Sequence, residues 1–302
     1  MNPAYPAFAL LGLIWGTNFL FMKWASVLIT PTQIVFLRVL FGFAPLFIYA
    51  LLSRSLQWRQ LRHAHHFLVM SVLATVVYYY AFAKGASLLP SSVAGMLSGA
   101  IPLFAFVCAW ALLRQERPTA RMVGGVICGF AGVLLIARPW ASSATAVSLQ
   151  GVLSMVVGSL SVGCSFAYAR RFLTKLDMSP VALSTYQIGL SLLIIACVTD
   201  FHGITRIGAD SRALIGLVLG LGVLGTGIAY IIYYYIVHKL GAVAASAVTY
   251  IPPIVALLMG VLFAHEAIRP LDLLAMSFVL GGVYFLQTGR RSGVSSPALK
   301  RI

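Results

Sequence analysis

Two stretches of the chain decide its fold: residues 94–102, AGMLSGAIP, and residues 244–252, AASAVTYIP. Each begins with alanine and ends with proline eight positions later, and a glutamate, Glu116 or Glu266, follows the proline after fourteen more. Two copies of one spacing in the two halves of a chain indicate an internal duplication. The chain is therefore expected to consist of two related units.

Other parts of the two halves also correspond. Residues 18–23, NFLFMK, resemble residues 165–170, SFAYAR, and a proline follows each segment. At the same distance beyond these prolines the first half has Arg38 and the second half has Gln187. The duplication thus extends over most of the chain, but its only deeply placed arginine occurs in one copy.

The composition indicates a membrane protein. Of the 302 residues 61% are hydrophobic and 9% are charged, and the mean hydropathy is +0.97. Soluble domains are about 45–50% apolar and about 25% charged, so a soluble fold of this composition would leave apolar surface uncovered. The apolar runs are continuous and lack the alternation of a membrane β-barrel. We expect an all-α polytopic membrane protein.

A helix needs about 20 residues to cross the hydrocarbon core. Ten apolar runs meet this length, at residues 5–26, 31–52, 67–86, 92–113, 120–137, 148–169, 180–199, 213–237, 243–262 and 271–288. Five helices in each half is an odd number, so the second half enters the membrane from the opposite side. The sequence predicts two inverted repeats around a central cavity, at 1–138 and 148–288, and a basic cytoplasmic tail at 289–302.

The net charge of +15 is interpreted as topology charge and not as a nucleic-acid surface. With a cytoplasmic N-terminus, fourteen of the 21 Lys and Arg residues fall on the cytoplasmic side and six on the other, while Arg38 lies inside the second helix. Basic residues accumulate in cytoplasmic loops. Both termini are therefore expected to be cytoplasmic, in the cytoplasmic (inner) membrane.

On these features the chain resembles the EamA type of drug/metabolite transporter. The resemblance is carried by WGTNF at 15–19, by Arg38, by GTGIAY at 225–230 and by the two Pro…Glu…Gly repeats. It implies two five-helix units around a cavity and the movement of small metabolites or drugs, often the export of amino acids. The second half departs from the pattern, since it lacks Trp-Gly and has Gln187 in place of arginine.

Arg38 is the most informative single residue. A guanidinium deep in a membrane helix costs about 2.5–3.5 kcal/mol on insertion scales, so it needs a partner or a wet cavity. It can bind a substrate carboxylate or join a polar network facing the cavity. The alternative is a packing anchor bonded to backbone carbonyls, and the sequence leaves both open.

Aromatic and polar side chains complete the candidate site. Interruptions at matching depth in the two halves of a transporter point to its binding site, which favours the polar residues near the two prolines, and aromatic rings suit planar or cationic solutes. Interfacial and core packing of the rings is the alternative. The candidate substrate-binding residues are Trp15, Asn18, Arg38, Tyr78, Tyr79, Ser98, Tyr168, Gln187, Tyr230, Thr249 and Tyr250.

Four residues are assigned structural or gating roles. Pro102 and Pro252 are expected to interrupt their helices, because proline removes a backbone hydrogen bond. Glu116 and Glu266 follow these helices, and a carboxylate is favoured at a helix N-terminus. We expect them to lock the loop or the N-terminus of the next helix, with gating as the alternative.

No catalytic, cofactor or metal site is expected. The sequence has no HExxH, no Gly-x-Ser-x-Gly and no CxxC spacing, and no Asp or Glu falls in the middle of an expected helix. We therefore predict a secondary transporter, a monomer in contact with membrane lipid, that exports a small-molecule substrate by alternating access without a proton-carrying carboxylate. A non-transporting membrane scaffold and an importer of the same fold are the alternatives.

Overall fold

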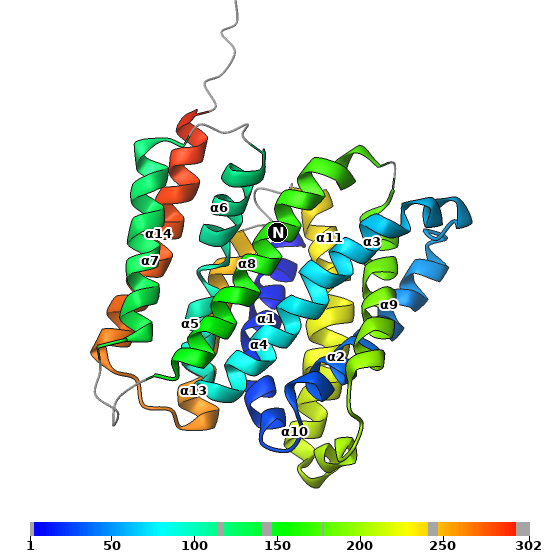
Figure 1. The fold of residues 1–302 in the computed structure, drawn as a ribbon, viewed down its shortest axis with the longest axis horizontal. Helices are drawn as coiled ribbons and strands as arrows, with labels where there is room; N and C mark the ends of the chain where they lie inside the picture. Colours follow the sequence, from blue (N-terminus) through cyan, green and yellow to red (C-terminus); the bar gives the residue numbers. More distant parts are fainter. Residues whose placement is uncertain (1–2, 114–117, 141–146, 177, 241–246, 294–302) are drawn as a thin grey trace, which may run out of the picture.

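The computed structural model describes residues 3–113, 118–140, 147–176, 178–240 and 247–293. Within these ranges it has ten helical spans that are long and apolar enough to cross a membrane (Figure 1). The all-α prediction with ten spans is therefore confirmed. The five spans of the first half are α1 (Ala4–Ser26), α2 (Pro31–Leu52), η1 (Trp58–His63) with α3 (Ala64–Ser71), η2 (Val72–Val76) and α4 (Val77–Leu88), α5 (Ser91–Ser98) with α6 (Ile101–Leu113), and α7 (Ala120–Ala137).

The second half has the same sequence of spans. They are α8 (Leu149–Phe172) with η3 (Leu173–Lys175), α9 (Pro180–Val198), then after the loop turn η4 (Ile204–Ala209) the span of α10 (Ser211–Ile215), η5 (Gly216–Ile228) and α11 (Ala229–Leu240), followed by η6 (Ala247–Tyr250) with α13 (Ile251–Ala264), and α14 (Pro270–Gly293).

The second span of each half begins in the same way. Thr30 precedes α2 and its hydroxyl accepts a hydrogen bond from the Gln33 amide, while Ser179 precedes α9 and accepts from the Ala182 amide. Each is followed by a proline at the first helical position, where the missing N–H costs nothing. The third span starts at Trp58 and not at 67, because a polar capping box begins a 3-10 turn that hydropathy does not predict.

Both predicted proline interruptions are present, and each lies in the residues just before its proline, where proline disfavours the helix. The fourth span breaks at residues 99–100, between α5 and α6, and Pro102 is the second residue of α6. In the ninth span η6 gives way to α13, in which Pro252 is again the second residue. In both copies the proline therefore sits in the first turn of a new helical segment.

Two spans contain π-helix, which the sequence analysis did not anticipate. The third span has the short π-helix η2 and the eighth span has the longer π-helix η5. π-Helical turns are rare and often occur at functional sites. The third and eighth spans occupy the same position in their halves, so the irregularity belongs to the repeat.

The packing of the helices follows the duplication. In the first half α1 packs on α13, and in the second half the corresponding α8 packs on α6; likewise α2 packs on η5, and α9 packs on α3. The pairs α5 with α13, α2 with α9 and α7 with α14 join equivalent spans of the two halves. Figure 1 shows α1 and α8, the first span of each half, running in opposite directions. The two repeats are inverted.

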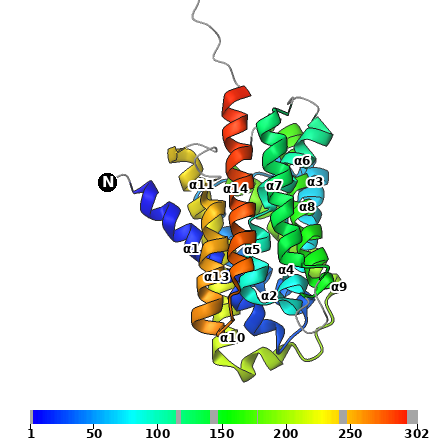
Figure 2. The ribbon, with the colours of Figure 1, turned by 90° about the vertical axis from the view of Figure 1, so that its left-hand side faces the viewer.

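The fifth and tenth spans form a pair at one side of the bundle (Figure 2). Their axes approach so closely that a Cβ atom added to Gly125 would lie 2.6 Å from the Gly282 carbonyl oxygen. Small residues allow such contact between membrane helices. Arg138 at the end of α7 forms a buried salt bridge with Asp272 in the first turn of α14.

Candidate functional site

Arg38 lies in the core between the two halves. Its side chain is 6% exposed, and its Nε atom donates a hydrogen bond to Oγ1 of Thr226 at 3.0 Å. The Thr226 hydroxyl in turn donates to the Leu221 carbonyl within η5 at 3.0 Å. Arg38 therefore bonds a side chain of the opposite half, and this contact does not match the predicted alternative of an anchor on backbone carbonyls.

The charge of Arg38 is balanced by an aromatic face and by no carboxylate within the described residues. Its Cζ atom lies 3.7 Å from the centroid of the Tyr79 ring, which is a cation–π contact. Across the part of the chain that the structure describes, the salt bridge found is that of Arg138 with Asp272. A guanidinium has five N–H donors, and no described residue accepts from the two terminal nitrogens of Arg38. These donors are suited to a carboxylate of a bound solute.

Gln187 occupies the equivalent place in the second half. Its Nε2 atom donates to Oγ1 of Thr75 in η2 at 2.9 Å. Its backbone carbonyl accepts hydrogen bonds from the hydroxyls of Ser71 at 2.8 Å and Ser191 at 2.7 Å. The Gln187 side chain is buried. In the second half, the place of the arginine is therefore taken by a neutral network of hydrogen bonds between protein groups.

Aromatic rings extend from Arg38 along the eighth span. The side chains of Tyr79 and Tyr230 lie close enough to interact, and the ring of Tyr230 lies 6.1 Å from that of Tyr234 between centroids. Tyr78 contacts Tyr79 at 5.1 Å. We call Arg38, Thr226, Tyr78, Tyr79, Tyr230 and Tyr234 the Arg38 cluster.

The ring row continues to the first helix. The Tyr234 ring meets that of Tyr233 at 5.9 Å, and Tyr233 meets Trp15 at 5.9 Å. The Tyr234 hydroxyl is hydrogen-bonded to Ser184 on α9. In each tyrosine triplet, 78–80 and 233–235, two rings face this interior and the third is exposed. Two of the three rings in each triplet therefore leave the lipid face.

Asn18 borders the Arg38 cluster on α1. Its side chain is buried, and its Oδ1 atom has no hydrogen-bond partner among the described residues. That oxygen lies against Gly225, the neighbour of Thr226, where any Cβ atom would collide with it. A buried acceptor without a partner is costly in a low-dielectric interior. In this conformation the oxygen is enclosed, so an N–H or O–H group could reach it only after the neighbouring helices move.

Other predicted site residues lie apart from the Arg38 cluster. Tyr168 is at the end of α8, where its hydroxyl and His66 Nδ1 form a 2.7 Å hydrogen bond. Ser98 is buried and donates to the Gly95 carbonyl of its own helix at 2.6 Å. Thr249 lies in η6, and Tyr250 donates to the Val283 carbonyl of α14 at 3.5 Å. Substrate contact by these four remains a prediction.

Glu266 binds a helix N-terminus, but not the one expected. Its carboxylate accepts from the backbone N–H and hydroxyl groups of Ser91 at 2.6 and 2.9 Å, and from those of Ser92 at 2.8 and 2.5 Å. It therefore caps α5 of the opposite half and not the next helix, α14, because the packing of α5 on α13 brings these ends together. Glu116 lies outside the described residues.

Sequence reasoning missed the polar partners of Arg38 and Gln187. Thr226 stands within the GTGIAY string, in a run of glycines, and a hydroxyl in such a run is the only signal that could have selected it. Thr75 and Ser184 carry no comparable signal. For metal ions, no group of three or more His, Cys, Asp or Glu side chains comes together within the described ranges.

Comparison with known proteins gives a consistent result. The model of the EamA-like transporter family matches residues 2–138 and 149–288. An uncharacterized transporter of Archaeoglobus fulgidus is 25% identical over 279 residues, with 92% of this chain and 96% of that protein covered. The uncharacterized transporter YoaV of Bacillus subtilis is 24% identical, with 90% and 92% covered.

Two further similarities add location and fold. The uncharacterized inner membrane transporter YedA of Escherichia coli K12 is 23% identical over 208 residues, which cover 67% of this chain and 63% of that protein. A solved structure described only as a crystal structure of a protein has a TM-score of 0.58 and 19% identity, covering 97% of this chain and 99% of that one. At this identity the likeness concerns the fold alone.

Proposed function

Because the chain belongs to the EamA-like transporter family and is a membrane transporter, we propose that it exports a small organic metabolite that carries a carboxylate, such as an amino acid, by alternating access. The proposal names the Arg38 cluster as the place where the solute binds. It also places the chain in the cytoplasmic membrane with both termini in the cytoplasm.

The observation that carries the proposal is the state of Arg38. The guanidinium is buried against the Tyr79 ring and bonds Thr226 through Nε, while its terminal nitrogens have no acceptor among the described residues. A charge at such depth is costly without a partner. A solute carboxylate supplies that partner, and arginine binds it through two parallel hydrogen bonds.

The surroundings of Arg38 suit an organic solute rather than an inorganic anion. Tyr78, Tyr230 and Tyr234 are partly exposed and present ring faces and hydroxyl groups. Aromatic faces pack well against apolar or planar groups, and phenol groups bind polar ones. The buried Oδ1 atom of Asn18 lacks a partner, and a donor such as an ammonium group would supply one once the halves move apart.

The inverted repeats support alternating access. Two similar bundles of opposite orientation can exchange conformations around a site between them. The Arg38–Thr226 and Gln187–Thr75 contacts are corresponding positions of this repeat, and each ends on a π-helical span. A rocking of one half against the other would expose these contacts to one side and then to the other.

The charge distribution supports the orientation. Ten spans are an even number, so both ends of the described chain lie on one side of the membrane. Fourteen basic residues accompany that side, which by the positive-inside rule is the cytoplasm. Reporter fusions at either terminus test this: activity of a cytoplasm-dependent reporter at both ends is expected, and activity of a periplasm-dependent reporter would reverse the orientation.

The decisive experiment is counterflow in proteoliposomes. Vesicles loaded with an unlabelled amino acid should accumulate the labelled one, and the matching amino acid carboxamide, which lacks the negative charge, should not compete. Counterflow with substrate on either side measures direction, and a preference for inward movement would identify an importer. Saturable binding without flux would indicate a receptor, and the absence of both would favour a scaffold.

A further inference from the structure

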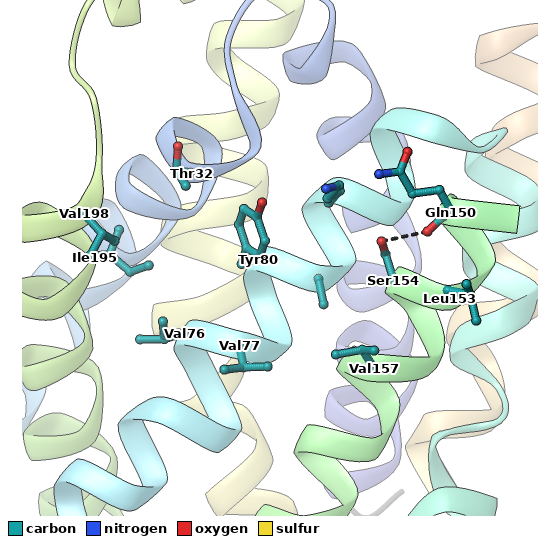
Figure 3. Close-up of a pocket in the computed structure, with 12 residues that line it drawn as sticks. Thr32, Val76, Val77, Tyr80, Gln150, Leu153, Ser154, Val157, Ile195 and Val198 are labelled. Atoms are coloured by element: carbon teal, nitrogen blue, oxygen red, sulfur yellow. Dashed lines mark hydrogen bonds between the residues drawn. The ribbon is translucent and has the colours of Figure 1, made fainter. Parts of the chain in front are cut away.

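A cavity lies away from the Arg38 cluster, between α2, the third span, α8 and α9 (Figure 3). Its volume is about 500 Å³, which is within the range of small-ligand pockets. Most of its wall is apolar and includes Val76, Val77, Leu153, Val157, Ile195 and Val198. The polar side chains of Thr32, Tyr80, Lys84, Gln150 and Ser154 also line it.

Three of the polar residues, Thr32, Lys84 and Gln150, share one end of the cavity. Thr32 is near the start of α2, Lys84 near the end of α4, and Gln150 near the start of α8. Figure 3 shows Thr32 and Gln150 at one end and Val76, Val77 and Val157 toward the other. In the proposed orientation, this end faces away from the cytoplasm.

The depth of the cavity is close to that of one lipid leaflet. Val76 precedes Lys84 by eight helical residues, which is a rise of about 12 Å at 1.5 Å per residue. Half of a hydrocarbon core of about 30 Å is about 15 Å. The cavity therefore extends from the headgroup level, at Lys84, to near the middle of the bilayer.

The cavity opens toward lipid. Leu153, Val157 and Val198, which form part of its wall, are each more than half exposed on the outside of the bundle. Among the residues that the structure describes, no acidic side chain is paired with the ammonium group of Lys84. An apolar slot of leaflet depth is thus open to the bilayer, with an unneutralised cation at its headgroup end.

We propose that this cavity binds an anionic phospholipid, with an acyl chain between α4, α8 and α9 and the phosphate at Lys84. Phospholipid is the amphiphile present at this depth at high concentration, and a lysine near the membrane surface favours the anionic kind. The site is separate from the Arg38 cluster. Its occupant does not depend on which metabolite the protein moves, so either proposal can fail alone.

The first test measures lipid binding to the full-length purified protein by native mass spectrometry. Phosphatidylglycerol and phosphatidylcholine with the same acyl chains are titrated in parallel. Lys84→Gln should weaken phosphatidylglycerol binding about fivefold and leave phosphatidylcholine binding unchanged. Lys175→Gln, the same charge change on an exposed residue near the opposite end of α8, is the control. Equal phosphatidylglycerol affinities of the wild type and Lys84→Gln would overturn the proposal.

The second test fills the cavity. Val157→Trp places a large ring in its wall, at a side chain that is 51% exposed, so the fold tolerates the change. Leu160→Trp, on the same helix but outside the cavity and 44% exposed, is the matched control. Val157→Trp should reduce binding of both lipids and Leu160→Trp should not. Equal binding by the two variants would contradict the assignment, as would displacement of phosphatidylglycerol by equimolar oleate, which would identify a fatty-acid site.

Discussion

The Nε atom of Arg38 donates a hydrogen bond to Oγ1 of Thr226 on the opposite half of the protein, at 3.0 Å. The second half repeats this relationship with different chemistry, since Gln187 donates to Thr75 at 2.9 Å. In both cases the donor is on the second span of one half. The threonine is in the π-helical segment of the third span of the other half. The duplication preserved the contact and kept the positive charge in one copy only.

The first prediction concerns that charge. Arg38→Gln makes the first half resemble the second, and glutamine can still donate to Thr226. We expect the affinity for a carboxylate solute to fall about tenfold or more, because one charge-assisted hydrogen bond is lost. The affinity for a neutral or cationic analogue should change little. Competition counterflow against the acid and its carboxamide measures this difference. Equal losses for both solutes would assign Arg38 a structural role.

The second prediction concerns the acceptor. Thr226→Val removes both the acceptor for Arg38 and the donor to Leu221, and should destabilise the protein by about 1–3 kcal/mol. Thr226→Ser keeps the hydroxyl and should remain close to wild type. The same two changes at Thr75 are the matched control, because its partner Gln187 is neutral. Thermal unfolding and counterflow should show a larger loss of carboxylate transport for Thr226→Val than for Thr75→Val. A larger loss for Thr75→Val than for Thr226→Val would contradict the assignment of carboxylate binding to Arg38.

Much of the fold was predictable because it depends on properties that are local in sequence. Continuous apolar runs predict spans, and eight-residue and fourteen-residue spacings predict the duplication, so the ten spans and the paired breaks before Pro102 and Pro252 were anticipated. The polar start of the third span at Trp58 was not, because hydropathy records apolar residues and not the capping turn that precedes them.

The candidate site was only partly predictable, for a geometric reason. Arg38, Tyr79 and Tyr230 were selected as rare or aromatic residues in membrane helices, and the fold brings them together. Their partner Thr226 was missed because a π-helix changes the direction in which every later side chain of the helix points. A hydrophobic pattern does not predict where such a π-helix occurs. Ser98 was selected for its depth, but its hydroxyl bonds the turn before it.

The third prediction concerns the peripheral pair of helices. Arg138 and Asp272 form a buried salt bridge between the end of α7 and the start of α14. Asp272→Asn leaves a buried guanidinium without its counter-charge and should destabilise the protein by about 3–5 kcal/mol. The double variant Arg138→Met with Asp272→Leu should recover most of this loss, because neither charge then remains buried. Denaturant unfolding of the wild type, Asp272→Asn and the double variant tests this, and a double variant no more stable than Asp272→Asn would contradict it.

The last prediction separates the cap of α5 from a gate. Glu266 accepts four hydrogen bonds from Ser91 and Ser92, so Glu266→Gln replaces an acceptor-only carboxylate by a group with one acceptor oxygen. The free energy of unfolding should fall by about 1.5–3 kcal/mol, with unchanged solute preference per folded molecule. Asp210→Asn is the control, because Asp210 caps the short exposed helix α10 and asparagine caps equally well. Since a static cap contributes equally to both directions of transport, unchanged stability with a rate altered in one direction only would identify Glu266 as part of a gate.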